Sequence, residues 1–116
     1  MWVDTHCHLD AAEFAGVEDD IAVGAAQSQV SMIVIPAVAR DNFVTVAELA
    51  RKHANCSYAL GIHPIYVPHA QESDLAVLRE TVAAAMNDTR FVAIGEIGLD
   101  FFCLLYTSPS PRDKRQ

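Results

Sequence analysis

The sequence predicts an α/β fold, the N-terminal half of a TIM-like (β/α) barrel, and two observations lead to this fold class. First, four short apolar segments alternate with helical segments in the order β-α-β-α-β-α-β, which is typical of a parallel sheet with right-handed crossovers. Second, histidines and carboxylates lie at the C-terminal ends of the predicted strands, the active face of barrel enzymes. The alternation alone also fits a doubly wound sheet, and the placement of the polar residues favours the barrel.

The first part of the chain is predicted to form a strand, a helix and a second strand. Residues 3–8 (VDTHCH) form a short strand. Residues 17–28 form a helix, because apolar residues recur there at helical spacing, at Val17, Ile21 and Ala25. Residues 30–38 (VSMIVIPAV) are an almost continuous apolar run, which indicates a strand that is covered on both faces.

The middle of the chain continues the alternation. Residues 40–54 form an amphipathic helix with Asp41 as its N-cap. Four apolar residues make up one face of this helix: Phe43, Val46, Ala47 and Ala50. Residues 56–64 (CSYALGIHP) form the third strand, which Pro64 ends because the residue before a proline favours an extended backbone.

A loop, a third helix and a fourth strand complete the predicted elements. The loop includes residues 67–69, and residues 73–86 form the helix with Ser73 as its N-cap. The apolar face of this helix consists of Leu75, Leu78, Val82 and Met86. Residues 91–100 (FVAIGEIGLD) form the fourth strand.

Composition limits the partners that the protein can have. Hydrophobic residues make up 52% of the 116 residues, enough for a core, and the net charge at pH 7 is −7. An acidic protein is a poor match for a basic groove that clamps nucleic acid. A phosphate ester stays possible as a substrate, because a bound divalent cation would supply positive charge locally.

Three features of the sequence predict a cytoplasmic protein without a membrane partner. No apolar run reaches the roughly 18 residues of a membrane-spanning helix, and the first residues lack a signal peptide's basic and apolar regions. The three cysteines, Cys7, Cys56 and Cys103, are odd in number and far apart. This spacing favours reduced thiols over disulfides.

The segment DTHCH carries two histidines, His6 and His8, that are two residues apart. On a strand, side chains at this spacing point to the same face, so both imidazoles could reach one metal ion. Cys7 points the other way and is expected to pack as a small apolar group. Asp4 lies on the histidine face, where it would either orient an imidazole or make a hydrogen bond at the strand end. Taken alone, such a pair is more often an ordinary polar strand end than part of a metal site.

Two further segments carry candidate functional residues. In GEIGLD, Glu96 follows an apolar strand between two glycines that permit close approach, and a buried carboxylate there needs a partner such as a metal ion. Asp100 is a candidate group on the substrate side, or an ordinary loop residue. In LGIHP, His63 could contact a substrate phosphate, although a histidine at a strand end is often only hydrogen-bonded. His53 and His69 are expected on the surface.

Together these segments resemble the TatD family of metal-dependent deoxyribonucleases. The motifs DTHCHLD, GIHP and GEIGLD occur in that family's order and spacing, and ARDNF at residues 39–43 also fits. The resemblance covers residues 2 to about 102 and implies a TIM-like barrel that hydrolyses phosphodiester bonds in DNA, typically from the 3′ end. GEIGLD favours this family over the wider amidohydrolases, many of which have a lysine at that strand.

The resemblance also implies a set of site residues. His6, His8 and Glu96 would bind one or two divalent cations (Mg, Mn or Zn), with Glu96 bridging them. His63 would lie near the substrate phosphate, and we take His63 and Asp100 as the catalytic candidates. The family's further ligands, two histidines and an aspartate on later strands, have no counterpart in this sequence.

Residues 1–102 and 103–116 are predicted to differ in character. The first range is the partial TatD-like barrel, and the second is predicted to be a flexible basic tail. Because the tail does not resemble the family, we interpret it as foreign sequence. A four-stranded sheet would expose unpaired edges, so we expect a truncated, inactive fragment that self-associates through those edges. Two alternatives stay open: another hydrolase with an HxH barrel (phosphoesterase or amidohydrolase), and a noncatalytic half-barrel that pairs with itself.

Overall fold

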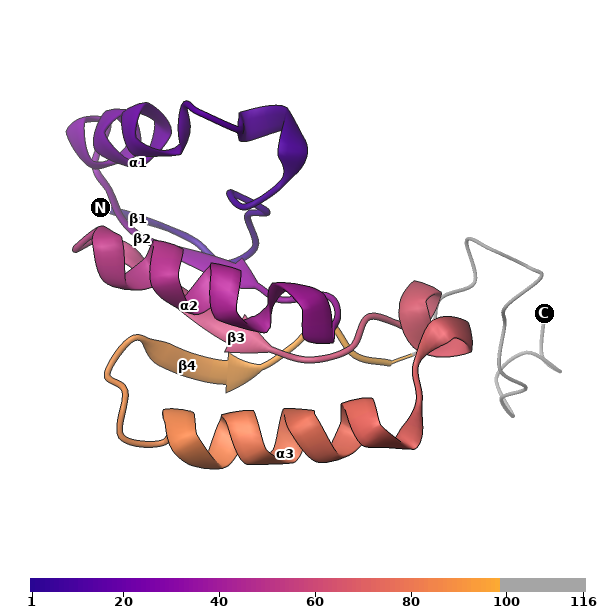
Figure 1. The fold of residues 1–116 in the computed structure, drawn as a ribbon. Helices are drawn as coiled ribbons and strands as arrows, with labels where there is room; N and C mark the ends of the chain where they lie inside the picture. The colour runs from indigo at the N-terminus through magenta and orange to yellow at the C-terminus, as the bar shows by residue number, and fades with distance from the viewer. Residues whose placement is uncertain (99–116) are drawn as a thin grey trace, which may run out of the picture.

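Four parallel strands and the helices between them make up residues 1–98, the part of the chain that this computed structural model describes (Figure 1). The strands are β1 (Trp2–Asp4), β2 (Val30–Pro36), β3 (Cys56–Leu60) and β4 (Phe91–Ile94). The α-helices are α1 (Glu18–Gln27), α2 (Phe43–Lys52) and α3 (Glu72–Ala85). Short 3-10 helices precede α1, α2 and α3: η1 (Ala12–Phe14), η2 (Arg40–Asn42) and η3 (Pro64–His69). The predicted order of strands and α-helices is confirmed.

The strand order distinguishes a barrel from a doubly wound sheet, the two architectures that the alternation of strands and helices left open. The strands lie side by side in the order β1-β2-β3-β4, and each neighbouring pair is parallel. A doubly wound sheet reverses its strand order partway, at the point where its ligand binds. Because each strand here lies next to its successor in the chain, the described part of the sheet has the order of a barrel, with β1 and β4 at its two edges.

The core lies between the middle of the sheet and α2. All five residues of β3 are buried, since this strand has a neighbour on each side and a helix over it. Figure 1 shows α2 lying over β2 and β3. The face predicted for α2 is buried as expected, and it consists of Phe43, Val46, Ala47 and Ala50. Ile35 of β2 and Leu60 of β3 are fully buried in the same cluster.

A polar group closes one end of this core. The ring of Tyr58 is buried, and its hydroxyl donates a hydrogen bond to Oδ2 of Asp88 at 2.8 Å. The Arg51 guanidinium contacts the same oxygen at 2.9 Å, and the Arg90 backbone N–H donates to Oδ1 of Asp88. The backbone N–H of Arg90, followed by the Tyr58 hydroxyl, lowers the pKa of Asp88. Asp88 therefore joins α2, β3 and the turn before β4.

All four predicted strands end earlier in the structure than the sequence indicated. β1 ends at Asp4, β2 at Pro36, β3 at Leu60 and β4 at Ile94. The candidate site residues therefore follow the strands in loops instead of lying on them. At β1 the cause is local, because Oδ1 of Asp4 accepts the backbone N–H of His6 at 3.1 Å and turns the chain. The stretch expected to be a loop after the third strand contains η3.

Two predicted helix starts were wrong. The first turn that contains Asp41 is the 3-10 helix η2, so α2 begins later and Asn42 is its N-cap. α3 begins before Ser73, with Gln71 at its N-cap, because Oδ2 of Asp74 accepts the Gln71 N–H at 3.0 Å. At η2 and at α3 a side chain three residues after the N-cap accepts the backbone N–H of the N-cap: Asn42 accepts that of Ala39, and Asp74 accepts that of Gln71.

α3 covers less of the sheet than its sequence pattern indicated. Leu75 and Met86, which belong to the predicted apolar face, are 50% and 69% exposed. Val77, Leu78 and Val82 pack against the core only partly. Figure 1 shows that α3 lies beside β4, an edge strand, which offers a helix less surface than the middle of the sheet does.

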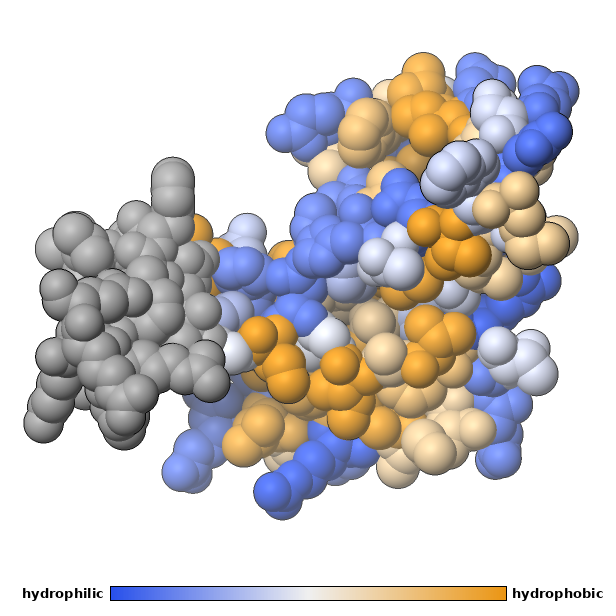
Figure 2. Space-filling model, turned by 180° about the vertical axis from the view of Figure 1, so that it is seen from behind, coloured by the Kyte–Doolittle hydropathy of each residue, from blue (hydrophilic) through white to orange (hydrophobic). Residues whose placement is uncertain are grey.

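The edge strands leave apolar side chains exposed. These side chains are Trp2 and Val3 of β1 and Val92 and Ile94 of β4. Figure 2, which views the molecule from behind, shows apolar side chains gathered on the face opposite to the view of Figure 1. Within residues 1–98 no helix is both long and apolar enough to cross a membrane.

The histidines and cysteines outside the candidate site are only partly as predicted. His69 is exposed, as expected. The expectation for His53 was wrong: its side chain is only 12% exposed, because Nε2 turns back toward α1 and lies 2.8 Å from Oδ1 of Asp19. Cys7 and Cys56 are free thiols, as predicted. The predictions for Cys103, for Asp100 and for a basic tail at residues 103–116 lie outside the described residues.

Candidate metal centre

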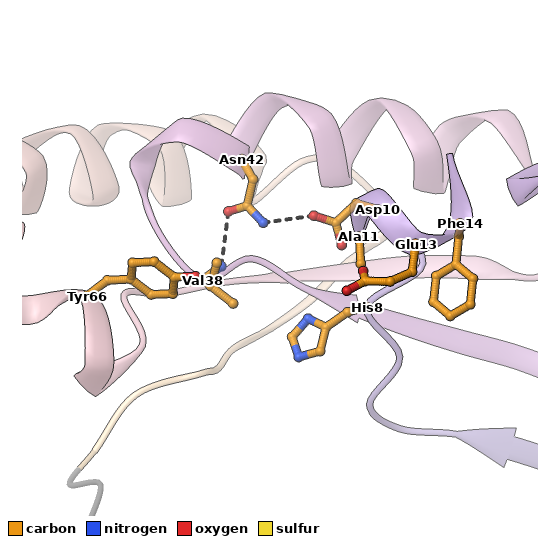
Figure 3. Close-up of a pocket in the computed structure, with 8 residues that line it drawn as sticks. All are labelled: His8, Asp10, Ala11, Glu13, Phe14, Val38, Asn42 and Tyr66. Atoms are coloured by element: carbon orange, nitrogen blue, oxygen red, sulfur yellow. Dashed lines mark hydrogen bonds between the residues drawn. The ribbon is translucent and has the colours of Figure 1, made fainter. Parts of the chain in front are cut away.

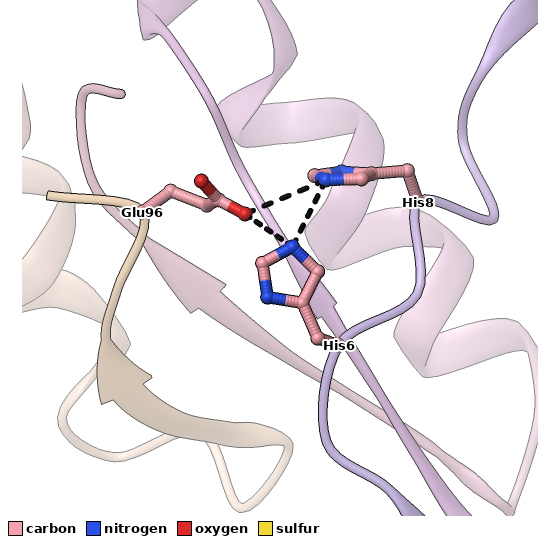
Figure 4. Close-up of side chains that lie close together, drawn as sticks. All are labelled: His6, His8 and Glu96. Atoms are coloured by element: carbon pink, nitrogen blue, oxygen red, sulfur yellow. Dashed lines mark hydrogen bonds and ion pairs between the residues drawn. The ribbon is translucent and has the colours of Figure 1, made fainter. Parts of the chain in front are cut away.

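His6, His8 and Glu96 meet at the C-terminal end of the sheet (Figure 4). One potential ligand atom from each side chain lies within 4.8 Å of those of the other two. The two histidine Nε2 atoms are 3.1 Å apart. Oε1 of Glu96 contacts Nε2 of His6 and lies 3.4 Å from Nε2 of His8. Two ring nitrogens and one carboxylate oxygen thus face a common point.

This meeting depends on the curvature of the sheet. The histidines follow β1 and the glutamate follows β4, and these strands are the opposite edges of the sheet. Neighbouring strands are spaced about 4.8 Å apart, so a flat sheet would separate the two edges by about 14 Å. The contact between His6 and Glu96 therefore indicates that the edges bend toward each other at this end, as in a barrel.

Close approach of two loops fixes the position of Glu96. The Gly95 N–H donates to the Leu60 carbonyl at 3.0 Å, directly after both strands end. A Cβ atom on Gly61 would overlap the Gly95 carbonyl oxygen, so only glycine fits at residue 61. From the sequence, close approach was expected at Gly95 and Gly98 and not at Gly61. A Cβ atom on Gly98 would meet nothing within 4 Å among residues 1–98, and its φ of +117° instead explains why glycine is favoured there.

His63 holds the other oxygen of the same carboxylate. Its Nε2 lies 3.3 Å from Oε2 of Glu96, and its Nδ1 accepts the backbone N–H of Ile65 at 3.1 Å. Because Nδ1 is an acceptor, the ring proton of a neutral His63 belongs on Nε2, the nitrogen that faces Oε2 of Glu96. His63 therefore orients Glu96 so that Oε1 faces His6 and His8.

The side chains of His6, His8 and Glu96 differ sharply in solvent exposure. The Glu96 side chain is 6% exposed, whereas those of His6 and His8 are 58% and 41% exposed. A buried carboxylate requires partners, and the partners of Glu96 within residues 1–98 are histidine nitrogens. The φ of Glu96 is +58°, a left-handed conformation that costs a residue with a side chain some free energy. The exposed side of the histidines leaves room for further ligands.

Cys7 and Asp4 take supporting positions. Cys7 packs against the hydrophobic core, and burial, followed by the charges of Asp4 and Asp10, raises the pKa of its thiol. A protonated, core-facing thiol is a poor metal ligand. Asp4 was left with two possible roles, and the structure shows the hydrogen bond at the strand end, to the His6 backbone, rather than a contact with an imidazole.

A pocket of about 510 Å³ adjoins the candidate metal centre at His8 (Figure 3). It is lined by His8, Asp10, Ala11, Glu13, Phe14, Val38, Asn42 and Tyr66. The Asn42 amide donates to Oδ2 of Asp10 at 2.9 Å, and its oxygen accepts the backbone N–H groups of Val38 and Ala39. The motif ARDNF by itself does not indicate this role for Asn42, since the bond joins residues 32 positions apart.

A family comparison covers nearly the whole chain. The model of the family described as TatD related DNase matches residues 3–116. The metal-dependent hydrolase YjjV of Escherichia coli K12 is 38% identical over 101 residues, which are 87% of this chain and 38% of that protein. The metal-dependent hydrolase YabD of Bacillus subtilis is 30% identical over 113 residues, which are 97% of this chain and 41% of that protein.

A solved structure supports the same relationship. The crystal structure of YjjV, a TatD homologue from Escherichia coli K12, matches this fold with a TM-score of 0.80 and 36% sequence identity. The match covers 88% of this chain and 39% of that one, so the chain spans about two fifths of the length of these relatives. By its sequence motifs, its strand order and these matches, the chain belongs to the TatD-related DNase family.

Proposed function

We propose that this chain forms the metal-binding part of a hydrolase that cleaves phosphodiester bonds in DNA. The observation that carries the proposal is the meeting of His6, His8 and Glu96 at the C-terminal end of the sheet. Membership of the TatD-related DNase family supports DNA as the substrate, and the names of YjjV and YabD support dependence on a metal.

The donor set fits a divalent cation. Two imidazole nitrogens and a carboxylate oxygen suit Zn and Mn. Mg would make fewer direct contacts with these side chains, because it usually keeps several bound water molecules. Without a cation, the 3.1 Å between the Nε2 atoms requires one histidine to donate a proton to the other. A cation would instead engage both nitrogens as acceptors, together with the facing oxygen of Glu96.

Each residue has a distinct task in this proposal. A divalent cation here would polarise a phosphoryl oxygen and lower the pKa of an attacking water molecule. His6 and His8 would hold the cation from the first loop, and Glu96 would hold it from the loop after β4. The Nε2 atom of His63 lies 3.3 Å from Oε2 of Glu96, so His63 would fix the carboxylate. In this proposal His63 would also face the substrate phosphate. Asp100 stays a catalytic candidate by sequence alone.

The activity of the 116-residue chain by itself is a separate proposal. Family resemblance implies digestion from the 3′ end and additional ligands on later strands, and this chain spans about two fifths of its relatives' length. We expect the chain alone to bind metal weakly and to show little nuclease activity, because the candidate site is open on the histidine side. A cytoplasmic location agrees with the free thiols of Cys7 and Cys56.

Metal titration tests the proposal directly. Calorimetry with Mn²⁺ and Zn²⁺ on the purified chain should show one saturable site that His6→Ala removes. Glu80→Gln, an exposed change on α3, is the matched control and should leave binding unchanged. If the wild-type chain binds neither ion, or if His6→Ala binds as well as wild type, the proposed metal centre is wrong.

A second candidate role is self-association. It is favoured by the exposed edges β1 and β4, whose backbone groups can pair with another strand. Light scattering across a range of protein concentrations would detect it. A dimer that persists with EDTA supports this role, and a monomer at every concentration contradicts it.

A further inference from the structure

We infer that the pocket next to His8 binds a nucleobase of the substrate and prefers bases that carry an exocyclic amino group. This inference rests on the proposed function for its biological meaning, because it deepens the choice of substrate at the same site. The pocket and the candidate metal centre share His8, so a ligand in one lies directly beside the other. The volume of about 510 Å³ lies within the usual range for small-molecule sites.

The charge of the pocket decides which part of a nucleotide it can take. Among the described residues, eight line the pocket; two of them are carboxylates, Asp10 and Glu13, and none is a lysine or arginine. A phosphate in this pocket would be repelled, whereas a hydrogen-bond donor would be attracted. A phosphate placed on a cation at His6 and His8 would therefore direct the attached sugar and base toward the acidic pocket.

The lining offers acceptors to such a donor. Oδ2 of Asp10 is occupied by the Asn42 amide, but its other oxygen, Oδ1, is buried without a hydrogen-bond partner among the described residues. A buried carboxylate oxygen without a partner leaves the negative charge of Asp10 poorly compensated, so Asp10 attracts a donor in the pocket by its charge and not by direct contact. Glu13 adds a second, exposed carboxylate, which can accept the donor directly. Amino groups of cytosine, adenine and guanine are donors that carboxylates accept, and cytosine N4 is a known example.

Aromatic rings supply the remaining contact. Phe14 and Tyr66 both line the pocket, and Figure 3 shows them on opposite sides of the group of lining residues. Aromatic side chains stack on bases of any sequence, so they provide affinity without discrimination. The selectivity would then come from the two carboxylates. Asn42 would act as a positioning residue, since it holds Asp10 against the loop after β2.

Deoxycytidine and deoxyuridine test this preference as a matched pair, because the amino group at position 4 of one replaces a carbonyl in the other. NMR titrations of the 116-residue chain in EDTA should show deoxycytidine binding about 10-fold more tightly, with shifts at Glu13, Phe14 and Asn42. Asp10→Asn, which keeps an acceptor for Asn42, and Glu13→Gln should each reduce the preference. Glu80→Gln should keep it. Equal binding of the two nucleosides, no binding of either, or an unchanged preference in both pocket variants would overturn the inference.

Phosphate provides an independent arm of the experiment. Deoxycytidine monophosphate should bind no more tightly than deoxycytidine in EDTA, and more tightly once Mn²⁺ is added. Tighter binding of the monophosphate in EDTA would mean that the pocket accepts phosphate, which contradicts the inference. The nucleoside titration needs no metal, whereas the Mn²⁺ titration needs no nucleoside. A chain that prefers deoxycytidine but fails to bind Mn²⁺ would therefore refute the proposed hydrolase and leave the pocket assignment standing.

Discussion

The middle of the sheet and its C-terminal rim differ in how their residues are held. In the middle, β3 is buried along its whole length under α2. Its neighbours in the sheet are β2 and β4, the strands directly before and after it in the chain. At the rim, His6, His8 and Glu96 come from loops after the two edge strands, whose own side chains are largely exposed. Stability is therefore concentrated in β2, α2 and β3, while the candidate chemistry depends on the two least covered strands.

This difference indicates that residues of the candidate site can be substituted without unfolding the protein. Loops that follow edge strands make few apolar contacts, so changes there cost little free energy of unfolding. Changes in the core should do the reverse and unfold the protein before they alter the geometry of the rim.

Ile35→Ala should produce the largest loss of stability. Ile35 is fully buried in β2, and truncation of such a side chain costs about 2–5 kcal/mol because it leaves a cavity. Urea unfolding followed by circular dichroism measures the change. Ile94→Ala, at an exposed residue of β4, is the control and should cost less than about 1 kcal/mol. Similar losses in both variants would show that the edge is as important to stability as the middle.

Glu96→Gln should abolish most metal binding with little effect on folding. Loss of the charged ligand is expected to weaken Mn²⁺ affinity roughly 100-fold, about 2.7 kcal/mol, as measured by calorimetry. The midpoint of urea unfolding without metal should stay close to that of wild type, since the contacts of Glu96 lie outside the core. A large fall in the midpoint would contradict the separation of rim and core.

Gly61→Ala should damage both regions at once. The added Cβ would overlap the Gly95 carbonyl oxygen and push the loop that carries Glu96 away from β3. Overpacking of this kind costs about 1–3 kcal/mol, and the displaced carboxylate should weaken Mn²⁺ binding as well. Gly24→Ala is the matched control, because a Cβ there meets nothing within 4 Å. Unchanged metal affinity in Gly61→Ala would show that the loop approach does not position Glu96.

Asp88→Asn should have the smallest effect, and it should depend on pH. Hydrogen bonds from Arg90 and Tyr58 lower the pKa of Asp88 in the folded state, whereas an unfolded Asp titrates near about 3.9. The ionised form therefore stabilises the fold above pH of about 4, and this contribution is lost as the pH falls through the folded pKa. The variant should lose about 1 kcal/mol at pH 7 and less at pH 3, as measured by urea unfolding. An equal loss at both pH values would contradict this assignment.

The spacing of apolar residues along the chain correctly predicted the buried face of a helix where that helix covers the middle of the sheet. The apolar face of α2 is buried as expected, because a helix of that pattern has one way to cover a sheet. The same reasoning failed for α3, since periodicity does not reveal that a helix lies beside an edge strand with little surface to cover. Strand ends were also missed, because the hydrogen bond that the His6 backbone N–H donates to the Asp4 carboxylate ends β1 before the predicted strand does.

The sequence by itself determined the family, the β/α order and the identity of the residues that meet at the rim, because these depend on residue types and their spacing along the chain. Only the tertiary structure decided that His63 holds Glu96, that Gly61 must be glycine and that Asn42 fixes Asp10. Each of these contacts joins segments at least 32 residues apart. Such contacts depend on which strands are neighbours and how far the sheet curves, and those are properties of the folded sheet as a whole.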